Sequence, residues 1–211
     1  MTDTAHLFGA ITGGIGAGKS YICQQLREMG VEVYDCDAAA KRLMRSDKIL
    51  RERLTELVGK EVYEGDALRK NVLTAFLLAS EENKQAVNAI VHPAVAQDFM
   101  ASGCEWLESA ILFESGFHQR VPLACVTCVV APLETRLRRV MERDGISMEQ
   151  ASRWITTQMP QEEIASRSDY IVHNDGITPL LPQLRGMLRA IAQRKHTYNI
   201  YSNNQSGTFK H

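Results

Sequence analysis

The apolar residues of this chain fall into five short runs, separated by longer stretches with helical spacing. Apolar runs of about four to eight residues are typical of buried strands, whereas apolar positions at i, i+4 and i+7 indicate a helix. Ile22, Leu26 and Met29 follow the helical spacing, and Gly30 stands where a helix C-cap belongs. The alternation predicts an α/β fold with a doubly wound, mainly parallel sheet. The expected strands are Leu7–Ile11, Val31–Tyr34, Trp106–Phe113, Ala124–Val130 and Tyr170–His173.

The interval between the second and third expected strands is longer than a right-handed crossover requires. Apolar residues recur in it at helical spacing, for example Leu50 and Leu54, and later Leu73 and Leu77. The excess length predicts an inserted helical lobe over the strand ends, where ligands bind in such sheets. A pair of packing helices without a ligand role remains open as the alternative.

These patterns divide the chain into a sheet-based core, an inserted lobe and a tail. We expect the core to comprise residues 1–37 and 104–200, and the helical lobe to comprise residues 38–103. Within the lobe, His92-Pro93 predicts a break between two helices, with Pro93 in a first helical turn. Residues 201–211 are polar and predict a frayed tail.

Composition narrows the class of partner. The 211-residue chain has a formal net charge of −1 and a pI near 6.6, which argues against nucleic acid or an anionic membrane as the main partner. No obligate protein partner is evident, and no segment has the layout of a signal peptide or a membrane span. Five cysteines without a regular framework predict free thiols in a reducing cytoplasm. Cys125 and Cys128 stand three apart in an expected strand, so they should face opposite sides of the sheet.

A glycine-rich segment directly after the first expected strand carries the strongest chemical signal. Gly13–Ser20 fit the pattern G-x-x-x-x-G-K-[ST], whose backbone N–H groups cradle the phosphates of a nucleotide. In that arrangement Lys19 reaches the β- and γ-phosphates, and the Ser20 hydroxyl ligates Mg²⁺. The alternative is a glycine-rich turn that only connects a strand to a helix.

Two carboxylates follow the second expected strand, at the sheet edge that the glycine loop also faces. One of Asp35 and Asp37 is expected to accept the proton of an attacking hydroxyl, and the other to hold a Mg²⁺-bound water. For either residue alone, an Asx turn that closes the strand is an equally good interpretation.

The expected helix after Pro132 carries a stripe of like charges. Arg136, Arg139 and Arg143 lie together on it, and like charges at i, i+4 destabilise a helix by roughly 0.2–0.5 kcal/mol. A bound anion would relieve this repulsion, and an ordinary solvated basic face is the alternative.

The segment from about 143 to 168 is expected to be a helical lid. Ser147–Gln150 form a capping box that starts a helix, and Pro160 stops it. A closing lid would exclude the water that competes for a transferred phosphoryl group. A GTPase switch is disfavoured, because Ile111–Gly116 lack D-x-x-G and Asn83–Ala86 lack the aspartate of N-K-x-D.

An ordered set of motifs resembles the dephospho-CoA kinase family, in the nucleoside-monophosphate-kinase-like group. The similarity runs from Gly9 to about Gly176, and it rests on Thr12–Ser20, Asp35–Asp37, His92-Pro93, Leu112–Gly116, Arg143–Gly145, Gln158–Pro160 and Asn174–Gly176. The resemblance implies a three-layer P-loop kinase core with a five-stranded, mainly parallel sheet, an inserted helical substrate lobe and a helical lid. It implies transfer of the ATP γ-phosphoryl group to the 3′-hydroxyl of dephospho-CoA, the last step of coenzyme A synthesis, with ATP and dephospho-CoA as partners and Mg²⁺ as cofactor.

The resemblance also implies roles for individual residues. It places the catalytic base at Asp37, a charge-stabilising arginine at Arg139 and catalytic phosphate contact at Lys19. The implied ATP-binding residues are Gly14, Gly16, Ala17, Gly18, Lys19, Ser20, Tyr21, Arg143, Asn174 and Gly176, with Ser20 as the Mg²⁺ ligand. The implied acceptor-binding residues are Asp35, Lys70, His92 and Glu114.

Two departures from the family pattern stand out. Ala110 occupies a position where the family usually has proline, and Lys70 stands where arginine is common. Lysine cannot copy the bidentate fork of arginine. Two other functions stay open from the residues themselves: a kinase for another small acceptor such as a nucleoside monophosphate, and a nucleotide-dependent switch or binding module.

Overall fold

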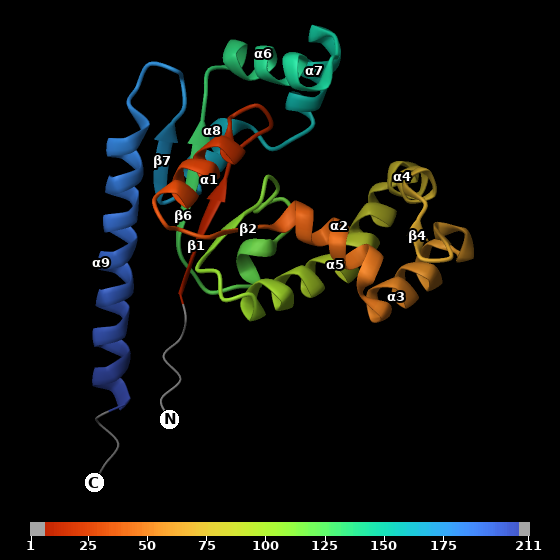
Figure 1. The fold of residues 1–211 in the computed structure, drawn as a ribbon, viewed down its shortest axis with the longest axis horizontal. Coiled ribbons are helices and arrows are strands. Elements are labelled where there is room, and N and C mark those ends of the chain that lie inside the picture. Colours follow the sequence, from red (N-terminus) through yellow and green to blue (C-terminus); the bar gives the residue numbers. More distant parts are fainter. Residues whose placement is uncertain (1–6, 207–211) are drawn as a thin grey trace.

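The computed structural model describes residues 7–206, which form a five-stranded parallel sheet between layers of helices (Figure 1). The strand order is β2-β5-β1-β6-β7, and every neighbouring pair is parallel. The predicted parallel sheet is therefore confirmed. Its strands are β1 (Phe8–Thr12), β2 (Val33–Asp35), β5 (Trp106–Glu108), β6 (Leu123–Val130) and β7 (Tyr170–His173).

Strand β5 ends at Glu108, earlier than the predicted end at Phe113. The chain then folds into turns, one of them closed by the Ser115 N–H donating to the Ile111 carbonyl oxygen (2.9 Å). Phe113 is buried although it lies in no strand. The apolar run reflects burial of a compact loop, which hydrophobicity alone does not distinguish from a strand.

Two apolar clusters cover the opposite faces of the sheet. One joins α1 and α9 to the face that carries Ile11, and the other joins α5 and α8 to the face that carries Ala10. Cys125 and Cys128 are buried free thiols in different clusters, as predicted. The three-layer α/β core is thus confirmed. These helices are α1 (Lys19–Glu28), α5 (Glu81–Ala101), α8 (Gln161–Ser166) and α9 (Leu180–Ser206).

Between β2 and β5 the chain forms a group of helices to one side of the sheet, on the right of Figure 1. Besides α5 they are α2 (Cys36–Ser46), α3 (Lys48–Val58) and α4 (Lys70–Ala79). The short 3₁₀ helix η1 (Lys60–Val62) leads into a hairpin of β3 (Tyr63–Glu64) and β4 (Ala67–Leu68). The sequence pattern does not predict this hairpin, because two-residue strands are too short to show a period.

The predicted helix break at His92-Pro93 is wrong: α5 is one helix with Pro93 in its interior. A proline inside a helix costs about 3 kcal/mol. Val91 and Val95 flank it on the buried side of α5, and each buried valine stabilises the fold by roughly 1.5–3 kcal/mol. Burial along the helix therefore outweighs the local penalty.

Two further helices lie above the sheet in Figure 1: α6 (Leu133–Asp144) and α7 (Met148–Thr156). The Ser147 hydroxyl oxygen accepts a hydrogen bond from the Gln150 N–H (3.2 Å), so the predicted helix start is confirmed. Pro160 lies beyond the end of α7 and directly precedes α8.

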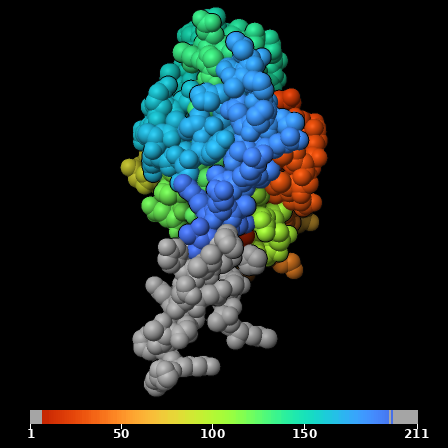
Figure 2. Space-filling view, turned by 90° about the vertical axis from the view of Figure 1, so that its left-hand side faces the viewer, coloured from red at the N-terminus to blue at the C-terminus, as the bar shows by residue number. Residues whose placement is uncertain are grey.

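The last helix, α9, runs along the outside of the molecule (Figure 2) and packs on β6 and β7. It continues to Ser206. The expected frayed tail is therefore wrong for residues 201–206, which belong to the helix. Extending an existing helix is far less costly than starting one, which explains how polar residues continue it. Residues 207–211 of the expected tail lie outside the described residues. Within residues 7–206, no helix has the length and hydrophobicity needed to span a membrane.

Candidate active site

The glycine-rich loop connects β1 to α1 at the carboxyl edge of the sheet. Helix α1 begins at Lys19, and Gly18 at its N-cap adopts a left-handed conformation (φ 91°). No side chain caps this end, so the first N–H groups of α1 are available to an anion. The loop and the start of α1 therefore form the phosphate-binding geometry that the sequence pattern predicts.

Side chains from α6 and from the residue that follows β7 hold the carbonyl oxygens of this loop. Arg136 Nε donates to the Ile15 oxygen (2.9 Å), and Arg139 donates to the Ala17 oxygen (3.2 Å). The Asn174 amide also donates to the Ala17 oxygen (2.9 Å). Carbonyl groups engaged in this way cannot turn toward a bound phosphate, so the loop is ordered for anion binding before nucleotide arrives.

Arg136 is only 5% exposed, and sequence analysis did not recognise its role. The like charges of the arginine stripe predict a bound anion, but the guanidinium of Arg136 instead donates a hydrogen bond to a backbone carbonyl oxygen. A Cβ added at Gly14 would collide with its guanidinium group. Arg143, the third member, forms an exposed pair with Asp144 (2.7 Å).

A cavity of about 590 Å³ opens beside the loop. Its walls come from the loop, the end of β2, the start of α2, the end of β5 and helix α6. Among its lining residues are Gly16, Gly18, Lys19, Ser20, Asp35, Asp37, Lys41, Glu108, Arg139, Arg143 and Gln158. Four predicted residues of the loop and α1 thus face one space with both aspartates, namely Gly16, Gly18, Lys19 and Ser20, and we call this space the phosphate cavity. Gly14 and Ala17 do not line it, and Ala17 is fully buried.

Lys19 and Glu108 form a buried ion pair in this cavity, with Nζ 3.8 Å from Oε1. Burial lowers the pKa of Lys19, and the neighbouring Glu108 carboxylate partly offsets that shift. Burial likewise raises the pKa of Glu108. Glu108 ends β5, the strand beside β1, and sequence analysis missed it because the strand was expected to continue past it.

The two aspartates have different environments. Asp35 caps α2, and its Oδ1 accepts a hydrogen bond from the Ala38 N–H (2.9 Å), which is the turn role that the sequence left open. Asp37 lies in the first turn of α2 with a side chain that is 74% exposed, 3.9 Å from Lys41 Nζ. Asp37 is therefore the less constrained of the two carboxylates.

The oxygen donors of the cavity fit a magnesium ion held together with a nucleotide. Ser20 supplies a hydroxyl, and Asp35 and Asp37 supply carboxylates on the opposite wall. Within residues 7–206, no group of three or more His, Cys, Asp or Glu residues forms a metal site by itself. Mg²⁺ is usually bound through one or two protein oxygens plus substrate phosphates, so this donor set suits it.

The remaining predicted residues lie in three places. A neighbouring cavity of about 500 Å³ is lined by Tyr21, Asn174 and Gly176 together with Gly18 and Arg139. Glu114 Oε1 accepts a hydrogen bond from the Met159 N–H (3.2 Å), within the expected lid and between α7 and α8. Lys70 is exposed at the start of α4 and lines neither of these cavities.

His92 lies on α5 in an apolar pocket of about 190 Å³ that Asp37 also lines. Burial, together with the nearby Arg120, lowers the pKa of His92. The imidazole is therefore mainly neutral at pH 7. This pocket, which we call the lobe pocket, adjoins the phosphate cavity because Asp37 and Ile111 line both.

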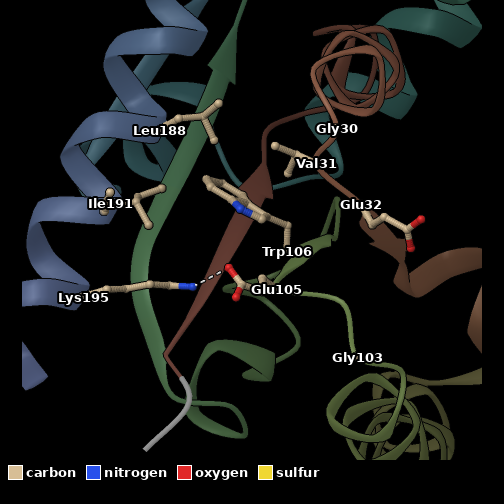
Figure 3. A pocket seen from close by; sticks show the side chains of 10 residues that line it. Gly30, Val31, Glu32, Gly103, Glu105, Trp106, Leu188, Ile191 and Lys195 are labelled. Carbon is tan, nitrogen blue, oxygen red and sulfur yellow. Dashed lines mark hydrogen bonds and ion pairs between the residues drawn. The ribbon is translucent and has the colours of Figure 1, made fainter.

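A further cleft of about 390 Å³ lies at the opposite edge of the sheet (Figure 3). The side chains of Trp106, Leu188 and Ile191 extend into it, and an ion pair joins Lys195 to Glu105 (2.8 Å). Trp106 starts β5, whereas the glycine loop follows the carboxyl end of β1. This cleft is therefore separate from the phosphate cavity.

A parallel sheet with this order, a phosphate loop after its central strand and facing carboxylates place the chain in the class of P-loop kinases. The solved structure of TT1252 from Thermus thermophilus is similar, with a TM-score of 0.72 and 33% identity over 90% of this chain and 97% of that one. A dephospho-CoA kinase from Campylobacter jejuni shares the fold, with a TM-score of 0.57 and 19% identity over the same shares.

Within that class, the chain belongs to the dephospho-CoA kinase family. The family's model, described as Dephospho-CoA kinase, matches residues 7–179. A dephospho-CoA kinase from Bacteroides fragilis (strain YCH46) is 41% identical over 92% of this chain and 97% of its own length. One from Porphyromonas gingivalis (strain ATCC BAA-308 / W83) is 35% identical over 88% and 94%. The chain is accordingly an ATP-dependent kinase.

Gly18→Ala should weaken ATP binding at least about tenfold, a free-energy change of about 1.4 kcal/mol. The new Cβ would collide with the Asn174 amide that orders the loop. Gly30→Ala is the control, because Gly30 has a similar positive φ but open space around it. Calorimetric titration should show weaker ATP binding for Gly18→Ala but not for Gly30→Ala. Both variants should lose roughly 1–2 kcal/mol of unfolding free energy, because each places a side chain at a positive φ. Equal ATP affinities would contradict the proposed close fit at Gly18.

Glu108→Gln should tighten the binding of metal-free ATP on the order of fivefold, or about 1 kcal/mol. The carboxylate repels the triphosphate and competes with it for Lys19, which lies 3.8 Å away. Glu105→Gln makes the same charge change on a residue that pairs with Lys195 instead. Titrations in EDTA should show the gain only for Glu108→Gln. Unchanged or weaker binding by that variant would show that the Glu108 carboxylate does not oppose the triphosphate.

Proposed function

We propose that this chain transfers the γ-phosphoryl group of ATP to the 3′-hydroxyl of dephospho-CoA, which yields coenzyme A and ADP in the final step of coenzyme A synthesis. The observation that carries the proposal is the phosphate cavity, in which Lys19 and the phosphate loop face Asp37. Membership of the dephospho-CoA kinase family supports this choice of acceptor over a nucleoside monophosphate.

ATP is expected to bind with its phosphates on the loop and its base toward β7. The backbone N–H groups of Gly14, Gly16, Ala17 and Gly18 are the expected phosphate contacts, and Lys19 would neutralise the β- and γ-phosphates. The Ala17 N–H donates to the Gly14 carbonyl oxygen (3.2 Å) and would have to exchange this bond for one to a phosphate.

The cavity lined by Tyr21, Asn174 and Gly176 adjoins the phosphate cavity, because Gly18 lines both. This position supports its use as the binding site for the adenosine part of ATP. Arg143 lines the phosphate cavity and would contact phosphate oxygens once α7 closes over it. Helix α8, the last part of the expected lid of residues 143–168, packs on the sheet and stays with the core.

The acceptor is expected to bind between the core and the helical lobe of residues 38–103. Asp37, which is exposed at the junction, would take the proton of the attacking hydroxyl as general base. Asp35 and His92 border the path of the acceptor. Lys70 and Glu114 are further candidates, from the rim of the lobe and the base of the lid respectively.

Magnesium is the expected cofactor, with Ser20 as its protein ligand. When bound, the ion neutralises charge that develops on the β- and γ-phosphates. The protein's own part is to position the two substrates in line and to stabilise the spreading negative charge, because phosphoryl transfer passes through a loose transition state. Arg139 lines the phosphate cavity and would help to stabilise this charge after its guanidinium releases part of its hydrogen bonding to the loop carbonyls, such as that of Ala17.

Several properties of the chain support a cytoplasmic enzyme that acts on small molecules. All five cysteines are free thiols, which suits a reducing compartment. The net charge of −1 does not favour nucleic acid or an anionic membrane as partner, and we propose no obligate protein partner.

Incubation with ATP, Mg²⁺ and dephospho-CoA should yield a product that mass spectrometry finds heavier by one phosphoryl group, with one ADP formed for each. A panel of nucleoside monophosphates is the comparison. Turnover confined to a nucleotide would reject dephospho-CoA as the acceptor. ATP binding without any acceptor-dependent release of ADP would favour a binding module instead.

Lys19→Ala and Arg139→Ala should lower kcat at least as much as Asp37→Asn does. An arginine at the transferring group contributes on the order of 10³–10⁵ in rate, and a general base contributes about 10²–10⁴. Arg138→Ala is the matched control, because Arg138 is an exposed neighbour on α6. Initial rates at saturating substrates test this ranking. If Arg139→Ala kept nearly full turnover, its proposed role would be wrong.

A further inference from the structure

Gln158 is a side chain of the phosphate cavity to which the proposed transfer assigns no part. It lies in the short segment between the end of α7 at Thr156 and the start of α8 at Gln161. Its Oε1 accepts a hydrogen bond from the Ile15 N–H of the glycine loop (2.7 Å). This bond spans 143 positions of the sequence, so only the tertiary structure reveals that Gln158 meets the loop.

Contacts of the residues that follow Gln158 hold this segment on the core. The Met159 N–H donates to Glu114 Oε1 (3.2 Å), in the turns after β5. Gln161 Oε1 accepts a hydrogen bond from the Ala131 N–H (3.0 Å), directly after β6. Helix α8 itself packs on β6. Gln158 is therefore anchored beside the loop, and closing of α7 over the cavity does not have to move it.

The hydrogen bond from Ile15 fixes which way the Gln158 amide points. A backbone N–H can only donate, so the amide atom that faces it is the oxygen, and the other atom is Nε2. Nε2 carries two N–H donors, and no group among residues 7–206 accepts a hydrogen bond from it. Gln158 thus has unused donors at the wall of the phosphate cavity.

The two adjoining cavities indicate which phosphate these donors can reach. Gly18 and Arg139 line both the phosphate cavity and the cavity proposed for adenosine. Ile15 and Gln158 line the phosphate cavity and not the other one. With the adenosine in its proposed place, the phosphates extend past Gly18 into the phosphate cavity. Gln158 is therefore on the side away from the adenosine, which is the side of the outermost phosphate.

A γ-phosphate oxygen would complete the hydrogen bonding of this amide. Hydrogen bonds to an ionised acceptor are stronger than those between neutral groups. A neutral donor also needs no counter-charge while the cavity holds no nucleotide. During transfer, negative charge spreads over the oxygens of the γ-phosphoryl group, so the same donor stabilises the transition state. ADP lacks this group and cannot form the contact.

Resting on the proposed function, in which the phosphates of ATP occupy this cavity, we infer that Gln158 Nε2 donates a hydrogen bond to a γ-phosphate oxygen. Gln158 is thus a specificity-determining residue that distinguishes ATP from ADP. Its Oε1 keeps the hydrogen bond from the Ile15 N–H, so one side chain both orders the loop and recognises the outermost phosphate.

Gln158→Leu in the full-length protein should lower the affinity for Mg²⁺-ATP, relative to that for Mg²⁺-ADP, about tenfold. Gln161→Leu is the matched control, because Gln161 also accepts a hydrogen bond from a backbone N–H but does not line the cavity. Its ratio of ATP to ADP affinity should equal that of the wild-type protein. Calorimetric titrations without an acceptor measure both affinities, and thermal unfolding shows that each variant is folded.

Gln158→Glu separates the roles of the two amide atoms. Its carboxylate can still accept the hydrogen bond from the Ile15 N–H, but it repels the γ-phosphate. The ratio of ATP to ADP affinity should therefore fall further than in Gln158→Leu. This variant also provides the test if Gln158→Leu does not fold.

Three results would overturn the inference. Equal losses of ATP and ADP affinity would show that Gln158 only orders the loop, and an unchanged ratio in Gln158→Glu would exclude a contact with the γ-phosphate. An equal change of the ratio in Gln161→Leu would trace the effect to the anchoring of α8. The titrations use no acceptor, so they stand apart from the choice of substrate. Failure of the wild-type protein to phosphorylate dephospho-CoA would reject the proposed function, whereas an unchanged ratio overturns this inference alone.

Discussion

Hydrogen bonds that hold the carbonyl oxygens of the glycine loop are the interaction on which the rest of the site depends. Arg136, Arg139 and Asn174 donate to the carbonyls of residues 15–17, and they come from α6 and from the residue after β7, both remote in sequence from the loop. Because these donors are already in place, nucleotide binding does not have to order the loop. Preorganised dipoles of this kind need little rearrangement when charge develops on a phosphate. Phosphate binding by the loop is therefore a property of the whole core.

A second constraint is the junction between the core and the helical lobe. The Phe99 ring, on α5, packs against Phe8 (4.7 Å between centroids) and Tyr34 (5.3 Å) on the sheet. Such contacts fix one end of α5 on the core, and the same helix carries the walls of the lobe pocket toward Asp37. Asp37, the proposed general base, lies at this junction and lines both cavities. The packing of apolar side chains thus fixes how α5 and the lobe pocket are placed relative to the phosphate cavity.

The charges around the loop are arranged so that none is both buried and alone. Lys19 is compensated by Glu108, Arg136 by the Ile15 carbonyl and Arg143 by Asp144. A buried charge without a partner is costly, so these pairings keep the cations in place while the site holds no triphosphate. In the proposed function, the phosphates of ATP replace Glu108 as the partners of Lys19. ATP binding would therefore replace one negatively charged partner of Lys19 by another, so that the buried ammonium group is never left without a counter-charge.

Much of this protein follows from its sequence. The apolar runs determine five strands, the glycine spacing determines a phosphate loop before α1, and the ordered motifs indicate the family. Local signals were insufficient where tertiary packing outweighs them. Pro93 stays inside a helix because the valines beside it are buried, and the segment around Phe113 is a buried turn and not a strand. The roles of Glu108 and Arg136 were invisible for a related reason, since each depends on a partner more than eighty residues away. Periodicity and residue spacing determine local structure, that is, which segments form helices, strands and loops. Which side chains meet across the sheet edge is decided only when the strands pair and the helices pack on them.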